Sequence, residues 1–297
     1  MTNTNRRTFL KQFTALGATA SLAAAATDWK KQIGLEMYTV RDLAAKDFEG
    51  TLTKVAEIGY KEIEPAGAHY GGLQPKQFRA LLDRLGLSMP STHEAATAGP
   101  DLEKELEGFQ IMGLKYTEIR NPAARGSQGV TEESVKRTAA DLNQFGKTTT
   151  KFGMKMLFHN HAQEFQRIEG SKLRPYDILL GETDPALVAM QLDIGWASVA
   201  GQNILEMFKK NPGRFELWHV KDARGIKILP ADLDQRARMR AVTLVPIGQG
   251  EVDYKSIFAG AEMAGMKHFC IEQDNAADWG DSIAAAKVCY KNLSKIL

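Results

Sequence analysis

The chain has 297 residues, of which 43% are hydrophobic and 25% carry a charge, enough for one large folded domain with a full core. Its formal net charge is +2, and Arg6, Arg7 and Lys11 are the charged residues among the first 26, so the remainder carries −1. A nearly neutral body gives no electrostatic reason to expect nucleic acid as a partner. The two cysteines, Cys270 and Cys289, form no CxxC pair, which argues against a disulfide framework or a zinc ribbon.

The first 26 residues are expected to be an export signal. Residues 5–11 read Asn-Arg-Arg-Thr-Phe-Leu-Lys, and a weakly apolar, alanine-rich stretch follows up to Ala26. This arrangement resembles the twin-arginine signal, and the alanine run offers a small-residue cleavage site. The apolar run is shorter than a stable membrane span of about 20 residues. We therefore predict a signal peptide at 1–26, a periplasmic or otherwise exported protein without a membrane span after cleavage, and one domain over 30–297.

From residue 30 onward, short apolar runs alternate with amphipathic stretches, which predicts strands that are each followed by a helix. The expected strands are 33–40, 61–64, 87–93, 116–121, 155–161, 188–194, 215–220 and 268–273. The expected helices are 47–58, 75–85, 101–112, 131–152, 175–180, 204–209, 253–264 and 281–295. Eight such units close a parallel barrel, so the predicted fold class is α/β, a single-domain (β/α)8 TIM barrel.

Two further expectations concern the connections. A doubly wound open sheet is the alternative fold, but the sequence shows no glycine-rich phosphate loop after the first strand, which weakens it. Residues 223–250 are expected to form a long irregular connection over the site.

Residues that can bind a metal or move a proton recur at the carboxyl ends of the expected strands. They are Glu64, His93, His159, His161, Asp193, His219 and Glu272. In a closed parallel barrel these ends meet at one face, within reach of one small ligand. Carboxylates with neutral imidazoles form a mixed site that suits Mn²⁺, Co²⁺, Zn²⁺ or Fe²⁺ better than Mg²⁺. Such a cation beside a sugar carbonyl makes a neighbouring C–H acidic enough for a carboxylate to remove its proton.

Several segments at these strand ends form recognisable motifs. Residues 158–165 read Phe-His-Asn-His-Ala-Gln-Glu-Phe, and further motifs lie at 191–196, 219–222, 245–250 and 271–274. The first is similar to the HNHxxEF segment of the xylose-isomerase-like TIM-barrel superfamily, and the others resemble the segments that follow it there. Members of that superfamily include sugar isomerases, epimerases, dehydratases and lyases. The resemblance covers essentially the whole chain after residue 30.

The resemblance implies that Asp193, His219 and Glu272 bind a metal at the ends of strands six, seven and eight. The family's ligand on strand five is usually Glu, whereas this chain offers His161 or His159. We favour His161 because it lies nearest the expected end of that strand. A histidine here argues against an epimerase mechanism that uses two glutamates symmetrically.

The resemblance also implies roles in proton transfer. Glu272 would act both as a metal ligand and as a base, while Glu64, His93 or Lys221 would handle the second proton. Acid–base chemistry of this kind needs a group that can hold a proton near the working pH.

We therefore expect an exported, metal-dependent sugar isomerase or epimerase that uses carboxylate and histidine chemistry on a keto-sugar held at the metal. The first alternative is a keto-sugar or keto-glycoside lyase or dehydratase, which begins with the same proton abstraction and then expels a β-oxygen. The second is a sugar-binding protein without catalysis. A nuclease ranks last because the chain lacks the basic surface expected of one. The expected partner is a small carbohydrate, and the oligomeric state is left open.

Overall fold

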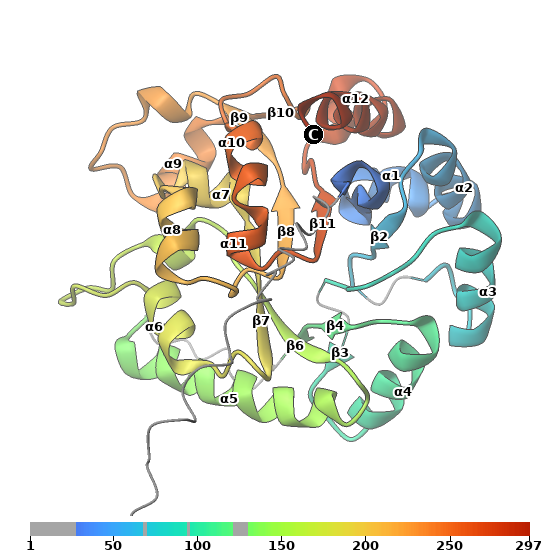
Figure 1. The fold of residues 1–297 in the computed structure, drawn as a ribbon, viewed down its shortest axis with the longest axis horizontal. Helices are drawn as coiled ribbons and strands as arrows, with labels where there is room; N and C mark the ends of the chain where they lie inside the picture. The colour runs from blue at the N-terminus through green and yellow to red at the C-terminus, as the bar shows by residue number, and fades with distance from the viewer. Residues whose placement is uncertain (1–27, 68–69, 94–95, 121–129) are drawn as a thin grey trace, which may run out of the picture.

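The computed structural model describes residues 28–67, 70–93, 96–120 and 130–297, so the predicted signal peptide lies outside the described residues. A parallel sheet of seven strands lies at the centre of the molecule (Figure 1). Its strands are β1 (Gly34–Glu36), β2 (Glu62–Glu64), β4 (Tyr116–Thr117), β6 (Lys155–His159), β7 (Val188–Asp193), β8 (Leu217–Val220) and β11 (His268–Ile271). They pair in the order β2-β1-β11-β8-β7-β6-β4.

Residues 87–93, the expected third strand, close the gap between β2 and β4. On one side, the backbone N–H of Ile63 donates to the carbonyl of Ser88 at 2.9 Å, and on the other, the N–H of Tyr116 donates to the carbonyl of Pro90 at 3.0 Å. The segment forms only isolated bridges because Pro90, in its middle, has no N–H to donate to a ladder. The predicted (β/α)8 TIM barrel is confirmed, with one irregular strand position.

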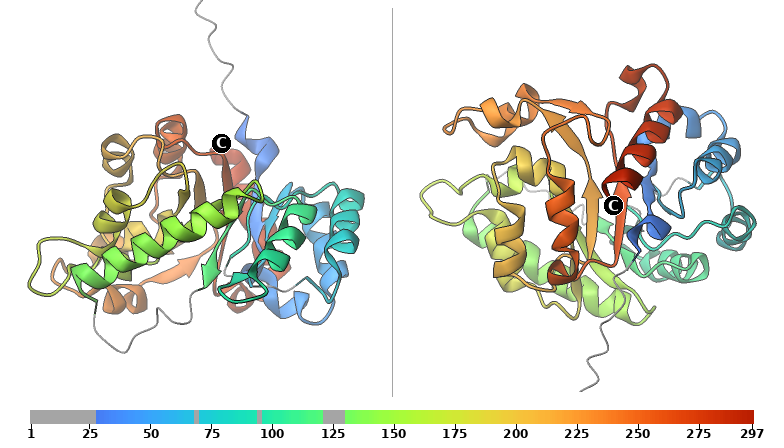
Figure 2. Two further views of the ribbon diagram at one scale, coloured as in Figure 1. Left: turned by 90° about the horizontal axis from the view of Figure 1, so that it is seen from below. Right: turned by 45° about the horizontal axis from the view of Figure 1, so that its top comes forward.

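Helices surround the strands in the views of Figures 1 and 2. They are α2 (Phe48–Ile58), α3 (Pro75–Leu85), α4 (Leu102–Met112), α5 (Glu132–Thr150), α6 (Pro175–Glu182), α8 (Ile204–Lys210), α10 (Tyr254–Ala259), α11 (Ala261–Ala264) and α12 (Ser282–Ile296). Gly86 and Gly113 end α3 and α4 in the left-handed conformation, with φ of 65° and 97°, which lets the chain turn back toward the next strand. The helices lie where the sequence predicts them.

The connection after β8 is not irregular, which corrects the expectation for residues 223–250. It contains β9 (Asp222–Arg224) and β10 (Thr243–Val245), which pair antiparallel, together with the 3-10 helix η5 (Ile226–Ile228) and α9 (Gln235–Ala241). Asp222 stabilises this region because its carboxylate accepts hydrogen bonds from the backbone N–H groups of Ala223, Gly248, Gly250 and Val252. A buried carboxylate that accepts from four backbone donors holds the two ends of this connection together.

The remaining short elements lie around the barrel. They are η1 (Trp29–Gln32), η2 (Met37–Val40), α1 (Arg41–Ala44), η4 (Gln163–Phe165), α7 (Ile194–Val199), η6 (Ala276–Trp279) and the parallel pair β3 (Ala96–Thr97) and β5 (Ile119–Arg120). Within the described part of the chain, none of the helices has the length and apolar character that a membrane crossing requires. Both cysteines are buried free thiols.

The alternation of side chains along the strands decides which residues line the barrel. Leu217 of β8 belongs to a small buried cluster with Leu157 and Ala189, apart from the main core. Because side chains two residues apart share a face of a strand, His219, His159 and Asp193 point to the same interior. Trp218 points the other way, since its ring packs against Phe208 and Phe258 outside the barrel.

Candidate metal and proton-transfer site

His219, on the inner face of β8, lies between two carboxylates. Its Nε2 is 2.7 Å from Glu64 Oε1, and its Nδ1 is 2.7 Å from Glu272 Oε2. Glu64 also accepts hydrogen bonds from the Ser91 hydroxyl and, at 2.7 Å, from Gln191 Nε2. Glu64 is wholly buried, so these three partners hold it in place. The geometry favours Glu64 as the residue that orients His219 rather than as a carrier of the second proton.

Asp193, His219 and Glu272 bring their ligand atoms within 4.8 Å of one another. Asp193 also begins α7, where its Oδ1 accepts from the backbone N–H of Trp196 at 2.7 Å and leaves Oδ2 toward the site. Three atoms of this group are buried and form no well-aligned hydrogen bond with the described residues: Asp193 Oδ2, His219 Nδ1 and Glu272 Oε2. The last two lie close to each other. In the described part of the chain these atoms have only ion-pair contacts, with Lys221 or with each other, and a divalent cation would give all three a direct ligand bond. One imidazole and two carboxylates therefore fit the predicted metal.

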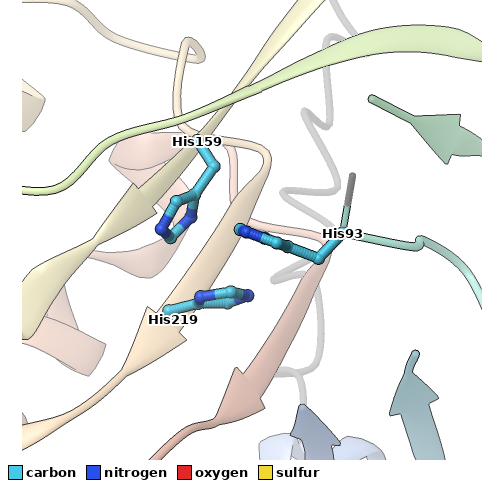
Figure 3. Close-up of side chains that lie close together, drawn as sticks. All are labelled: His93, His159 and His219. Atoms are coloured by element: carbon cyan, nitrogen blue, oxygen red, sulfur yellow. The ribbon is translucent and has the colours of Figure 1, made fainter. Parts of the chain in front are cut away.

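Three imidazole rings face one small space, as Figure 3 shows for His93, His159 and His219. The ring centroids of His159 and His219 are 4.5 Å apart, and those of His93 and His159 are 4.7 Å apart. The Nδ1 atoms of His93 and His159 are buried and find no hydrogen-bond partner among the described residues. His219 thus belongs to two groups of close ligand atoms. His159 lies in the group with His93 and not in the group with Asp193 and Glu272.

The two histidines predicted for the fifth strand lie in different positions. The strand β6 ends at His159, two residues earlier than expected, so His159 and not His161 is the strand-end residue. The ring of His161 lies 5.0 Å from that of His159, and His161 is exposed. Its backbone N–H donates to Glu164 Oε2 at 2.8 Å, which fixes the loop. Burial lowers the pKa of His161, and Asp193 and Glu272 oppose that shift, so His161 lies within the influence of these carboxylates. Both histidines therefore stay candidate ligands.

Lys221 is a buried cation among three carboxylates. Its Nζ lies 3.2 Å from Asp193 Oδ2, 3.2 Å from Glu272 Oε2 and 2.7 Å from Asp274 Oδ1, and the side chain is 1% exposed. Burial by itself would lower the pKa of Lys221, but the three carboxylates outweigh it and raise that pKa. A raised pKa favours the ammonium form of Lys221.

The Tyr254 hydroxyl holds the backbone of Lys221. It accepts from the Lys221 N–H at 2.8 Å and donates to the Lys221 carbonyl at 2.7 Å. We expect Tyr254→Phe to lower the free energy of unfolding by about 1–3 kcal/mol, because two buried backbone groups lose their partner while the ring stays. Urea denaturation measures this change. The variant Tyr290→Phe is the control, since Tyr290 lies at the outer helix α12, and an equal loss in both variants would contradict the expectation.

The carboxyl groups of the site have pKa values that are pushed apart. Burial raises the pKa of Glu272, but Lys221 and His219 outweigh it and hold that pKa well below 4.5. Burial, together with the neighbouring Glu272, raises the pKa of Asp274 to about 7 although Lys221 opposes this. Burial would likewise lower the pKa of His219, yet Glu64 and Glu272 raise it well above 6.5. The site thus combines an ionised carboxylate with a carboxyl group that exchanges its proton near neutral pH.

Four residues of the site were missed in the sequence: Glu36, Ser91, Gln191 and Asp274. Glu36 ends β1 and is 1% exposed, and burial beside Glu272 raises its pKa well above 4.5. Selecting residues at the carboxyl ends of strands would have found Glu36. It was missed because the first strand was expected to end at residue 40, four residues later than it does. Gln191 and Asp274 lie two residues from Asp193 and Glu272, so the alternation of side chains would have indicated both.

The contact between Glu64 and His219 has a testable consequence. We expect Glu64→Gln to weaken Mn²⁺ binding by about 10–100-fold, because a carboxylate on the second ring nitrogen orients a metal-binding histidine and raises its basicity. Titration with Mn²⁺ by electron paramagnetic resonance gives the dissociation constant. Glu62→Gln is the matched control, since Glu62 lies on the same strand face but contacts His268 at 2.9 Å. Equal Mn²⁺ affinity in wild type and Glu64→Gln would contradict this role.

A closed parallel barrel with a fitting cation site at the carboxyl ends of its strands is the arrangement found in TIM-barrel enzymes. The chain belongs to the xylose isomerase-like TIM barrel family, whose model matches residues 52–289.

Inosose dehydratases are among the curated relatives. The one from Clostridium perfringens is 29% identical over 156 residues, which cover 51% of this chain and 50% of the relative. The one from Geobacillus kaustophilus is 27% identical over 233 residues, which cover 70% of this chain and 73% of the relative. The chain therefore spans about half the length of the first of these relatives and almost three quarters of the second.

Solved structures share the fold. A sugar phosphate isomerase/epimerase from Parabacteroides distasonis matches with a TM-score of 0.70 and 19% identity, covering 94% of this chain and 98% of the other. A probable 3-DHS dehydratase from Bacillus anthracis has a TM-score of 0.63 and 16% identity, covering 89% and 98%. A xylose isomerase-like TIM barrel protein from Mycobacterium smegmatis, in complex with magnesium, has a TM-score of 0.56 and 16% identity, covering 89% and 96%.

Proposed function

We propose that this protein is a divalent-metal-dependent enzyme that removes a proton next to the carbonyl of a keto-sugar and then expels an oxygen substituent from the β-carbon. The observation that carries the proposal is the convergence of Asp193, His219 and Glu272, whose ligand atoms lie within 4.8 Å. The similarity to inosose dehydratases supports elimination as the outcome. The donor set favours Mn²⁺, Co²⁺, Zn²⁺ or Fe²⁺ over Mg²⁺.

The chain's own carboxyl groups supply the proton transfers. When bound, the cation supplies polarisation of the substrate carbonyl. The ionised Glu272 accepts the proton from carbon, and the electrons of that C–H bond form a carbon–carbon double bond as the C–O bond at the β-carbon breaks. Asp274, with its pKa raised by burial to about 7, gives a proton to the departing oxygen. The leaving group departs as water or an alcohol, and solvent exchange restores both carboxyl groups.

The histidines at the other side of the site are suited to bind hydroxyl groups. Burial, together with His219 and His93, holds the pKa of His159 well below 6.5, so its ring is neutral. The buried Nδ1 atoms of His93 and His159 have no hydrogen-bond partner among the described residues and can donate to or accept from a sugar hydroxyl. We assign His93 to substrate binding rather than to proton transfer.

Isomerisation or epimerisation is the second candidate outcome. Glu272 and Asp274 both contact the Lys221 ammonium, at 3.2 Å and 2.7 Å, so a proton taken by one carboxyl group lies near the other and can be returned to carbon. The strand-five position disfavours the symmetrical two-glutamate version, because His159 stands there.

Product analysis separates the outcomes. The protein is incubated in D₂O with keto-glucosides, inososes and free ketoses, with Mn²⁺ or with a chelator, and products are followed by mass spectrometry and NMR. Release of water or an aglycone that depends on Mn²⁺ supports elimination. A new ketose or aldose that carries deuterium supports isomerisation and overturns the elimination step. Sugar binding that is unaffected by the chelator, without turnover, would show a binding protein.

Cation binding is expected to depend on pH with a defined sign. A cation can bind His219 Nδ1 only after the imidazolium loses a proton. Burial lowers the pKa of His219, but Glu64 and Glu272 outweigh it and raise that pKa well above 6.5, so the ring holds its proton at neutral pH. We expect the Mn²⁺ dissociation constant to fall as pH rises from 6 to 8, by about tenfold per unit while one proton is released per ion. Calorimetric titration in buffers of different ionisation enthalpy counts the protons, and a pH-independent affinity would exclude His219 as a ligand.

We also propose that residues 1–26 direct export by the twin-arginine route, which the sequence of residues 5–11 supports. Fractionation of cells that express the full chain tests this. The protein is expected outside the cytoplasm, whereas the Arg6→Lys, Arg7→Lys double variant is expected to remain inside. Export of both alike would exclude this signal.

A further inference from the structure

The Lys221 ammonium contacts the carboxylate oxygens that a cation would use. These are Asp193 Oδ2 and Glu272 Oε2, each 3.2 Å from Nζ, and both are buried atoms without a hydrogen bond among the described residues. A divalent cation lies about 2.0–2.2 Å from a carboxylate oxygen, so it would lie no more than about 5.4 Å from this ammonium. Two such charges in a fully buried site repel strongly, because little solvent screens them.

Asp274 offers the ammonium a second position. Its Oδ1 makes the shortest of the three contacts, at 2.7 Å, and its side chain is 29% exposed, against 0% for Asp193 and 12% for Glu272. Asp274 is not among the residues whose ligand atoms gather within 4.8 Å at the cation site. The ammonium can therefore keep this contact while leaving the other two, and the Trp196 ring, whose centroid is 5.0 Å from Nζ, lies near it.

The backbone at Lys221 cannot follow such a movement. The Tyr254 hydroxyl forms hydrogen bonds with both the N–H and the carbonyl of Lys221. A Cβ added at Gly195 would lie 2.5 Å from that carbonyl oxygen, so the backbone segments at Gly195 and Lys221 are in close contact. Only the four-carbon side chain is left to move the charge.

We propose that Lys221 is a built-in competitor for the cation site, whose ammonium binds Asp193 and Glu272 until a divalent cation displaces it onto Asp274. This inference rests on the proposed metal-dependent function. Lys221 thereby balances the buried carboxylates before loading and sets the threshold of cation concentration at which the site loads. After loading, the Lys221–Asp274 pair lies at the more exposed side of the site.

A double-mutant cycle on cation affinity tests the proposal without measuring activity. Mn²⁺ dissociation constants are measured by electron paramagnetic resonance for the wild type, Lys221→Met, Asp274→Asn and the double variant. Lys221→Met is expected to bind Mn²⁺ at least about tenfold more tightly, because the competing charge is gone. Asp274→Asn is expected to weaken binding several-fold when Lys221 is present, because the displaced ammonium loses the one carboxylate contact that it would otherwise keep. In the Lys221→Met background the same change is expected to have less than about a twofold effect.

Other arrangements give different results. If Asp274 bound the cation directly, or if Lys221 acted from a fixed position, Asp274→Asn would weaken binding by the same factor in both backgrounds, and the proposal would be overturned. Lys221→Arg keeps the charge and is expected not to tighten binding. Lys221→Gln replaces Lys221→Met if circular dichroism shows that the latter is unfolded. Wild-type protein that is folded but binds no Mn²⁺ would overturn the proposed function as well, whereas binding with an additive cycle overturns only the role of Lys221.

Discussion

Glu272→Gln is expected to lower the turnover of a keto-sugar by about 10³-fold or more, because the amide cannot accept the proton from carbon. Glu272 lies at the end of β11 with its Oε2 2.7 Å from His219 Nδ1, and its pKa is held low by Lys221 and His219 against the effect of burial. The amide retains one oxygen for the cation, so the Mn²⁺ affinity is expected to fall much less than turnover.

Steady-state kinetics at saturating Mn²⁺, together with the dissociation constant of the ion, separate these two effects. Glu262→Gln serves as the control, because Glu262 lies on the outer helix α11. A Glu272→Gln variant with turnover within tenfold of wild type would exclude Glu272 as the base.

His219→Asn is expected to lose detectable Mn²⁺ binding and to lower the free energy of unfolding by about 3 kcal/mol or more. The loss of stability follows because Glu64, which is wholly buried, would face the interior without its 2.7 Å partner, and an uncompensated buried charge is costly. Chemical denaturation and Mn²⁺ titration measure the two effects.

The double variant Glu64→Gln, His219→Asn separates stability from metal binding. Removing both charges is expected to restore most of the stability, because the buried carboxylate is gone, but not the affinity for Mn²⁺. A His219→Asn variant that binds Mn²⁺ as tightly as wild type would remove His219 from the cation site.

The alternation of apolar and polar stretches was enough to predict the barrel and most of its site. Residues at the carboxyl ends of strands converge whatever the exact strand lengths are, so position placed Asp193, His219 and Glu272 at one face, and the family resemblance implied that these three bind a metal. The predicted strand boundaries were less accurate. The strand β1 ends at Glu36 and β6 at His159, each a few residues earlier than predicted, and the first of these errors hid Glu36.

Two features depended on contacts that no local pattern encodes. The buried network that holds Glu64 joins Ser91, Gln191 and His219 from separate parts of the chain. The order of the region after β8 comes from the Asp222 carboxylate, which collects four backbone donors up to thirty residues away. Such long-range hydrogen bonds are set by the closed fold, whereas composition indicated only a loop.

The sharing of one cation by Asp193, His219 and Glu272 is the central claim, and an anomalous difference map tests it most directly. Crystals of the protein grown with Mn²⁺ are measured on either side of the manganese absorption edge. We expect one strong peak about 2.0–2.4 Å from a ligand atom of each of the three residues. A fully loaded ion elsewhere in the molecule, with these three side chains bonded only to protein groups, would contradict the account.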